Sequence, residues 1–167
     1  RIVHPRYGAG VVIGEKSLTF KGKTRKYHIV ELIGGRGEVM IPIKLAEDMD
    51  IRMAIKNMET IEEVFDNPPN VLSDNYRTRQ AKINDKISTR DPKALAQALR
   101  DLAWREHVHK LTGVEQKMKT KLIKMLSREM AVIRPNMTIK TASSCLTNML
   151  YEMIDHHQPT VETAPAS

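Results

Sequence analysis

The sequence predicts an α+β protein with two modules, a small bent β-sheet or barrel followed by a bundle of four or five helices. Up to about residue 45, short runs of alternating apolar and polar residues are separated by glycine turns, and beyond it the apolar residues recur with helical spacing. A proline-rich segment at 67–70, which ends a short predicted helix, is a natural boundary between a β module and a helical module. We therefore expect a sheet domain at 1–55, a helical domain at 56–155 and a disordered tail at 156–167.

The predicted strands begin after a tight turn near the start of the chain. Pro5 fixes its own φ and biases His4 toward extended geometry, while Gly8 and Gly10 permit φ values that other residues disfavour. We expect strands at 10–20, 26–32 and 39–43, joined by turns at 21–23 and 34–37. Arg1 lies within a further short strand, so we expect the native start to lie a few residues upstream.

Capping residues mark the starts of the predicted helices. Asp91 is a good N-cap before Pro92, Thr112 and Glu115 have capping-box spacing, and Asp74 offers a cap for an earlier helix. Pro135 ends the helix that begins at Thr112. The expected helices span 60–65, 74–88, 91–109, 112–134 and 138–153.

The composition is typical of a cytoplasmic globular protein. The chain has 167 residues, of which 41% are hydrophobic, and no apolar run approaches the roughly 18 residues that span a bilayer. No secretory signal opens the chain. The single cysteine, Cys145, cannot form an internal disulfide, which fits a reducing compartment, and we expect it to be a small core residue rather than a reactive thiol.

The net charge of +7 is concentrated in the helical part. Residues 74–134 contain 15 basic and 7 acidic residues, an excess of +8, whereas residues 1–55 carry +4. A localised basic region favours a phosphate-bearing partner or an acidic protein surface, with a plain solvated surface as the alternative.

The sequence contains no pattern typical of an enzyme or a metal site. His107 and His109 are two residues apart and point to different faces of a helix. No Cys/His cluster has zinc spacing, and no phosphate-binding glycine loop or nucleophile elbow occurs. We therefore expect no catalytic activity, no metal and no cofactor.

Several short motifs, in this order and spacing, resemble the CarD/CdnL family of bacterial transcription regulators. The resemblance implies a Tudor-like N-terminal domain, shared with the transcription-repair coupling factor, that binds the β subunit of RNA polymerase. It also implies a helical domain on promoter DNA at the upstream edge of the bubble. The motifs are Val3-His4-Pro5, Tyr7 to Gly10, Gly22 with Tyr27, Met40 to Ile43, Arg52, Arg100-Asp101-Leu102, and Leu111-Thr112 with Glu115.

The resemblance assigns an aromatic DNA wedge to Tyr76. Asn75-Tyr76 with Arg79 corresponds to the family's Asn-Trp-x-x-Arg, so tyrosine replaces the usual tryptophan. A tyrosine can still stack on bases, but it has less area and a hydroxyl that needs a partner. Ala81 stands where the family has a lysine, and Arg77 and Lys82 are nearby cations that can replace its charge.

The spacing leaves two interpretations open for the helical residues near Tyr76. On a continuous helix Tyr76 shares an apolar face with Ile83 and Ile87, or it projects beyond the core from the helix start. Arg79, Lys82 and Lys86 form one basic stripe that either contacts phosphates or is simply solvated.

Further along the chain, Trp104 is a rival wedge, although core packing against a neighbouring helix is the better interpretation. A second basic stripe, for which solvated surface is the default interpretation and auxiliary phosphate contact the alternative, comprises Lys117, Lys121, Lys124 and Arg128.

Leu18 and Met40 fall at positions where the family touches polymerase, and exposed apolar side chains on a sheet suit a protein partner, whereas the alternative is that either is a core residue. The sequence therefore predicts a monomeric, non-enzymatic regulator that bridges the polymerase β subunit and promoter DNA and stabilises the open complex. The alternative is a polymerase-binding adaptor whose helical domain binds another protein and not DNA.

Overall fold

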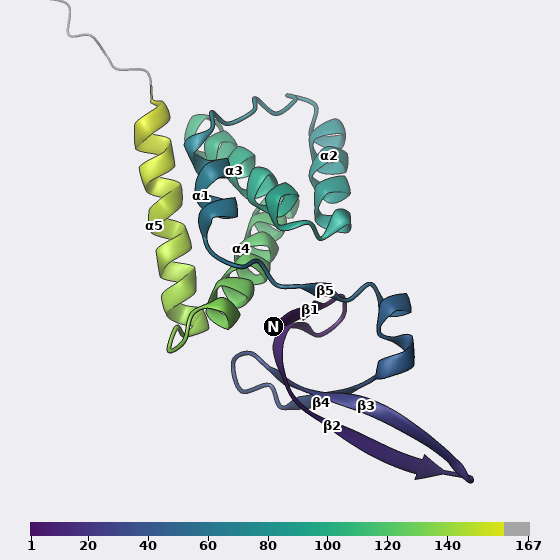
Figure 1. Cartoon of the computed structure of the whole chain (residues 1–167). Coiled ribbons are helices and arrows are strands. Elements are labelled where there is room, and N and C mark those ends of the chain that lie inside the picture. The colour runs from purple at the N-terminus through teal and green to yellow at the C-terminus, as the bar shows by residue number, and fades with distance from the viewer. Residues whose placement is uncertain (159–167) are drawn as a thin grey trace, which may run out of the picture.

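The computed structural model describes residues 1–158, in which an antiparallel sheet is followed by five α-helices (Figure 1). This is the α+β arrangement predicted from the sequence. The strands are β1 (Ile2–His4), β2 (Gly8–Phe20), β3 (Lys23–Leu32), β4 (Glu38–Pro42) and β5 (Arg52–Met53), with the short 3-10 helices η1 (Ile43–Leu45) and η2 (Glu47–Met49) before β5. The helices are α1 (Glu59–Asp66), α2 (Tyr76–Thr89), α3 (Pro92–Val108), α4 (Gly113–Ile133) and α5 (Ile139–His157).

The sheet is open, with the strand order β4-β3-β2-β1-β5, so β4 and β5 form its edges. Strands β2 and β3 form a long hairpin that extends away from the helices (Figure 1). Lys21 and Gly22 connect them with φ values of 49° and 72°, the geometry that two-residue hairpin loops favour. The register shifts between Val12 and Gly14, and the resulting bulge bends the strand.

The opening turn requires glycine at two positions for different reasons. Gly8 has a φ of 82°, which side chains disfavour. At Gly10 the reason is space, because a Cβ there would lie 2.7 Å from both Glu31 O and Val30 Cγ1. The turn thus brings β1, β2 and the end of β3 into close contact.

The helix starts follow the predicted caps, with one difference. Asp91 accepts a hydrogen bond from Ala94 N, and Thr112 and Glu115 form the reciprocal capping box, as predicted. The cap of α2 is Asn75, whose side chain accepts from two backbone N–H groups, and not Asp74. Asp74 instead pairs with Arg105 at 2.8 Å.

One apolar core connects the helices to the base of the sheet. Ala9 of β2 belongs to the same buried cluster as the helical residues, and Val3, Val11 and Ile33 pack against it. Cys145, expected in the core, is a half-buried free thiol at its margin. The largest fully buried apolar side chains are Ile61, Ile83, Leu95, Leu99, Leu102, Leu122, Leu126, Met130 and Leu146.

The boundary predicted for the C-terminal tail is wrong by two residues. Helix α5 continues through His157, whose Nδ1 lies 2.8 Å from Met153 O. Residues 156–157 belong to the last turn of α5, and the contact with Met153 O holds His157 there. The prediction grouped them with the Pro/Thr/Ala-rich residues that follow and therefore missed this turn. Positions 159–167 of the predicted tail lie outside the described residues.

A part-buried ion pair joins the sheet module (residues 1–55) to the helical module (α1 to α5). Arg52 donates two parallel hydrogen bonds to the carboxylate of Glu129, at 2.6 and 2.7 Å, and a third to Arg90 O at 3.0 Å. Ile55 N donates to the same carboxylate at 2.8 Å. The end of the sheet, the end of α2 and the C-terminal part of α4 therefore meet at one point.

His4 lies near this junction and is held in its neutral form. Its ring Nδ1 accepts hydrogen bonds from Arg6 N at 3.0 Å and Tyr7 N at 3.3 Å. Burial, and then the positive charges of Arg90 and Arg6, lower the pKa of His4 below its ordinary value of 6.5. The folded state therefore takes up a proton at this site less readily than the unfolded chain.

We predict a loss of stability in mild acid that depends on His4. The contribution is present above pH 6.5 and is lost as the pH falls through 6.5 toward the lower pKa of the folded state, because the unfolded chain is protonated first. Urea unfolding at pH 7.5, 6.0 and 5.0 should show a smaller loss for His4→Asn, whose amide oxygen can accept the same two bonds without titrating. A stability difference between wild type and variant that stays constant across these pH values would contradict the prediction.

Candidate functional site

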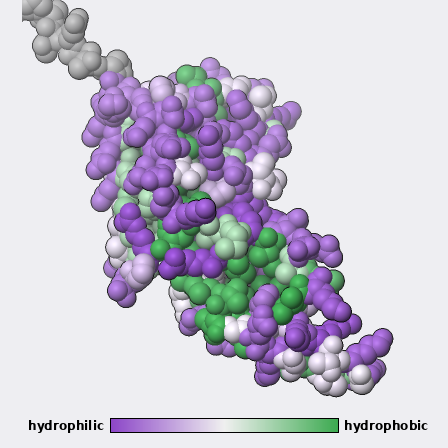
Figure 2. All heavy atoms as spheres, in the orientation of Figure 1, coloured by the Kyte–Doolittle hydropathy of each residue, from purple (hydrophilic) through white to green (hydrophobic). Residues whose placement is uncertain are grey.

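Leu18 and Met40 lie on the same face of the sheet. Leu18 pairs with Arg25 and Met40 pairs with Ile29, and the two partners, four residues apart on β3, face the same side. Met40 is 50% exposed and Leu18 is half-buried. Figure 2 shows hydrophobic side chains gathered over the sheet module, whereas the helical module presents a mainly hydrophilic surface. An exposed apolar sheet face suits contact with another protein.

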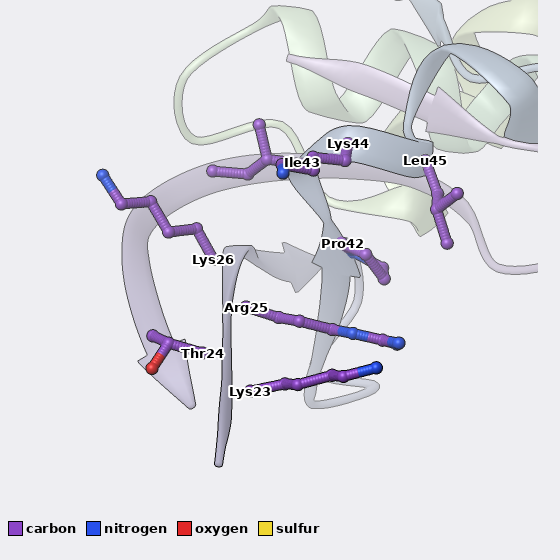
Figure 3. A pocket seen from close by; sticks show the side chains of 8 residues that line it. All are labelled: Lys23, Thr24, Arg25, Lys26, Pro42, Ile43, Lys44 and Leu45. Atoms are coloured by element: carbon purple, nitrogen blue, oxygen red, sulfur yellow. The ribbon is translucent and has the colours of Figure 1, made fainter. Parts of the chain in front are cut away.

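A groove of about 770 Å³ lies along β3, the end of β4 and η1. Figure 3 shows Lys23 and Arg25 extending side by side on the side of Pro42 and Leu45, while Lys26 extends away from them. Its lining combines apolar and basic side chains with no acidic one: Lys23, Thr24, Arg25, Lys26, Pro42, Ile43, Lys44 and Leu45. The groove therefore favours a partner surface that is partly apolar and partly acidic.

The edge strand β4 adjoins this groove. Its inner side pairs with β3 from Glu38 to Pro42, and no strand pairs with its outer side in residues 1–158. An unpaired strand edge offers backbone donors and acceptors to a strand of another protein. The apolar face, the groove and this edge together form one candidate protein-docking region.

Tyr76 is the first residue of α2 and is 50% exposed. By helical spacing Tyr76 lies on the same side of α2 as the buried residues Ile83 and Ile87, but at the helix start its side chain projects beyond the core. The side chain of Arg77 lies against it, with Nε donating to Tyr76 Oη at 3.2 Å and the guanidinium carbon 5.7 Å from the ring centre. The pair presents an aromatic ring and a cation together.

The expectation of an exposed basic stripe on α2 is wrong for Arg79. The side chain is 4% exposed and donates to Glu115 Oε1 at 2.6 Å, Ser73 O at 2.6 Å and Asp74 O at 3.1 Å. Glu115 is itself fully buried. The spacing of Arg79, Lys82 and Lys86 places them on one face of α2. The spacing does not show that the start of α4 covers the part of this face that contains Arg79. Arg79 anchors the loop before α2 and the start of α4.

The other two predicted cations of α2 differ from each other. Lys82 is exposed, as predicted. Lys86 is half-buried, with Nζ 3.2 Å from Gln97 Oε1 and 3.8 Å from Asp101 Oδ2, and burial lowers its pKa. Tyr76, Arg77 and Lys82 are therefore the exposed members of the predicted DNA-binding set on this helix.

Trp104 lies on α3 and is half-buried, with its ring centre 5.6 Å from that of His107. It is less exposed than Tyr76, which makes Tyr76 the more accessible of the two aromatic candidates. The second predicted stripe, on α4, is also divided, because Lys117, Lys121 and Lys124 are exposed whereas Arg128 is half-buried.

The starts of α2 and α4 lie at the same end of the helical module. Gln80 Nε2 donates to Thr112 Oγ1 at 3.2 Å, next to the Arg79–Glu115 pair. Exposed Lys110 and Lys117 flank the start of α4. The sequence motifs predicted the two helices independently of each other. In the structure the pair formed by the motif arginine Arg79 and the capping-box glutamate Glu115 brings their starts together.

Within residues 1–158, no group of three or more His, Cys, Asp or Glu side chains is arranged to hold a metal ion. Across the same residues, every helix falls short of the length or apolar character needed to cross a membrane.

Two protein-family models match the chain. Residues 1–55 match the model described as CarD-like/TRCF RID domain, and residues 60–147 match the model described as CarD, C-terminal domain. The first match contains the strands with Leu18 and Met40, and the second contains Tyr76 and Trp104.

Proposed function

This chain belongs to the CarD family, which are RNA polymerase-interacting transcription regulators, and we propose that it stabilises the open promoter complex. In this proposal the sheet module binds the polymerase β subunit, and the helical module binds promoter DNA at the upstream edge of the bubble. Binding to open DNA more tightly than to closed DNA shifts the equilibrium toward the open form.

The docking region on the sheet supports the polymerase part of the proposal. Leu18 and Met40 share a face, and the basic groove beside β4 suits an acidic, partly apolar partner. Docking there raises the local concentration of the helical module at promoter DNA, so a weak contact that does not read sequence is sufficient.

The position of Tyr76 carries the DNA part of the proposal. An exposed ring at a helix start can enter a base step and offset the cost of unstacking it. Arg77 and Lys82 then contact phosphates, since both are exposed, whereas buried Arg79 supports the helix from within.

The test is the lifetime of open complexes formed with and without the protein. We expect Tyr76→Ala to remove most of the protein-dependent increase in lifetime, because base–aromatic stacking contributes about 1–3 kcal/mol. Tyr76→Trp should retain or exceed the wild-type effect. Tyr151→Ala is the matched control, since Tyr151 is an exposed tyrosine on α5.

An unchanged lifetime with Tyr76→Ala would overturn the wedge assignment. A titration of the full chain with DNA across salt concentrations distinguishes the adaptor alternative, because phosphate contacts make the affinity fall steeply with salt. Absence of salt-dependent DNA binding, with polymerase binding retained, would favour a helical module that binds protein.

A further inference from the structure

A cavity of about 250 Å³ lies where the sheet module meets the helical module. The opening turn forms one side of it, the end of α2 and the start of α3 form another, and α4 closes it. Its basic lining residues are Arg6, Arg52, Arg90, Lys121 and Arg128.

The positive charge in this cavity is not balanced. Glu129 is the one acidic residue of the lining, and its carboxylate is occupied by Arg52 and by Ile55 N. Among the described residues, no carboxylate forms a salt bridge with the other four basic residues of the lining. Two modules therefore meet across a surface with an excess of cations.

Two guanidinium groups converge beside the opening turn. Arg128 Nη1 lies 3.9 Å, and Arg36 Nη2 lies 3.5 Å, from the point where a Cβ on Gly8 would stand. Arg128 Nε is buried and has no hydrogen-bond partner within residues 1–158. Burial and the nearby Arg36 lower the pKa of Arg128, as expected for a cation without a counter-charge. A native fold rarely leaves a buried cationic donor unpaired without a ligand or other reason.

We propose that this cavity binds a small phosphate-bearing anion, with inorganic pyrophosphate as its simplest form. Guanidinium groups bind phosphate oxygens through paired, charge-assisted hydrogen bonds, and four unpaired cations favour a multivalent anion. Arg6 would bind from the sheet module, and Arg90, Lys121 and Arg128 from the helical module. The anion therefore joins the two modules, and this function is separate from DNA contact at Tyr76.

An anion that binds only the folded chain, in which the two modules are in contact, raises the stability of that folded state by mass action. At a pyrophosphate concentration 100-fold above Kd, the thermal unfolding midpoint of the full chain should rise by about 5–10 °C. Sodium chloride at equal ionic strength should produce a much smaller shift.

Calorimetric titration with pyrophosphate tests the assignment. Arg128→Gln removes the charge and leaves a shorter, uncharged polar side chain, and we expect it to weaken binding at least about 10-fold, as for a lost charged hydrogen bond. Lys124→Gln is the matched control, because Lys124 is exposed on the same helix and does not line the cavity. The unfolding midpoint of each variant without ligand shows that both are folded.

Three results would overturn the proposal. In the first, pyrophosphate raises the thermal unfolding midpoint no more than chloride does. In the second, Arg128→Gln and Lys124→Gln lose equal affinity for pyrophosphate, which would indicate a general surface charge effect. A DNA duplex that displaces pyrophosphate, with the displacement lost in Arg128→Gln, would assign the cavity to DNA phosphates instead of a small anion. Retained binding in Lys124→Gln with loss in Arg128→Gln would support the proposal.

Discussion

Replacing Glu115 with alanine is expected to lower the free energy of unfolding by about 3–5 kcal/mol, because it leaves the buried guanidinium of Arg79 without its counter-charge. Arg79 is 4% exposed and Glu115 is fully buried, so water cannot solvate the remaining cation. Glu115 also accepts a hydrogen bond from Thr112 N at 2.8 Å, and the capping box of α4 is lost with it. The loss should appear in urea unfolding at neutral pH.

The pH dependence of the same variant has a definite sign. Burial raises the pKa of Glu115, but the hydrogen bonds from Arg79 and Thr112 outweigh it and the net pKa is below its ordinary value of 4.5. The stability that depends on this carboxylate is therefore present above pH 4.5 and is lost as the pH falls toward the lower pKa of the folded state. Below that range, wild type and Glu115→Ala should differ less than at neutral pH.

Two control variants distinguish loss of the Arg79–Glu115 ion pair from general damage to α4. Glu152→Ala changes an exposed glutamate of α5 and should alter stability by no more than about 0.5 kcal/mol. The double variant Arg79→Met, Glu115→Met should be more stable than Glu115→Ala alone, because it removes both buried charges. A loss below about 1 kcal/mol in Glu115→Ala would mean that Arg79 finds water or another acceptor.

Local patterns predicted most of the fold because capping and turn chemistry act over a few residues. Asp91 with Pro92 and Thr112 with Glu115 begin helices as their side chains dictate, and Lys21–Gly22 forms the hairpin turn. Asp74 and Asn75 are both suitable caps, and the pairing of Asp74 with Arg105, 31 residues away, is a long-range contact that local propensity does not contain.

The candidate site was harder to predict because burial depends on which helix covers which face. Arg79 belongs to a motif, yet its partner Glu115 lies 36 residues away on another helix. Lys86 likewise lies beside Gln97 and Asp101 of α3. The family resemblance located Tyr76, whereas only the structure shows that Arg77 lies against its ring and Arg79 lies beneath the surface.

Replacing Arg52 with alanine is expected to destabilise the chain by about 3 kcal/mol, because the buried carboxylate of Glu129 then has no counter-charge and keeps only the hydrogen bond from Ile55 N. The side chain of Glu129 is 2% exposed, and Arg90 O also loses its donor. Arg52→Lys should recover only part of the loss, since an ammonium cannot form the two parallel bonds of a guanidinium. Arg25→Ala, which changes an exposed arginine of β3, is the matched control.

Arg52→Ala should also weaken the attachment between the sheet module and the helical module, because the Arg52–Glu129 pair lies where β5, α2 and α4 meet. We expect limited proteolysis to cut Arg52→Ala between β5 and α1 faster than wild type or Arg25→Ala, at a temperature where all three are folded. Equal cleavage rates, with a stability loss no greater than in Arg25→Ala, would contradict this role for the pair. Because tethering amplifies a weak DNA contact only while the modules hold a suitable geometry, Arg52→Ala should also reduce open-complex stabilisation although Tyr76 is intact.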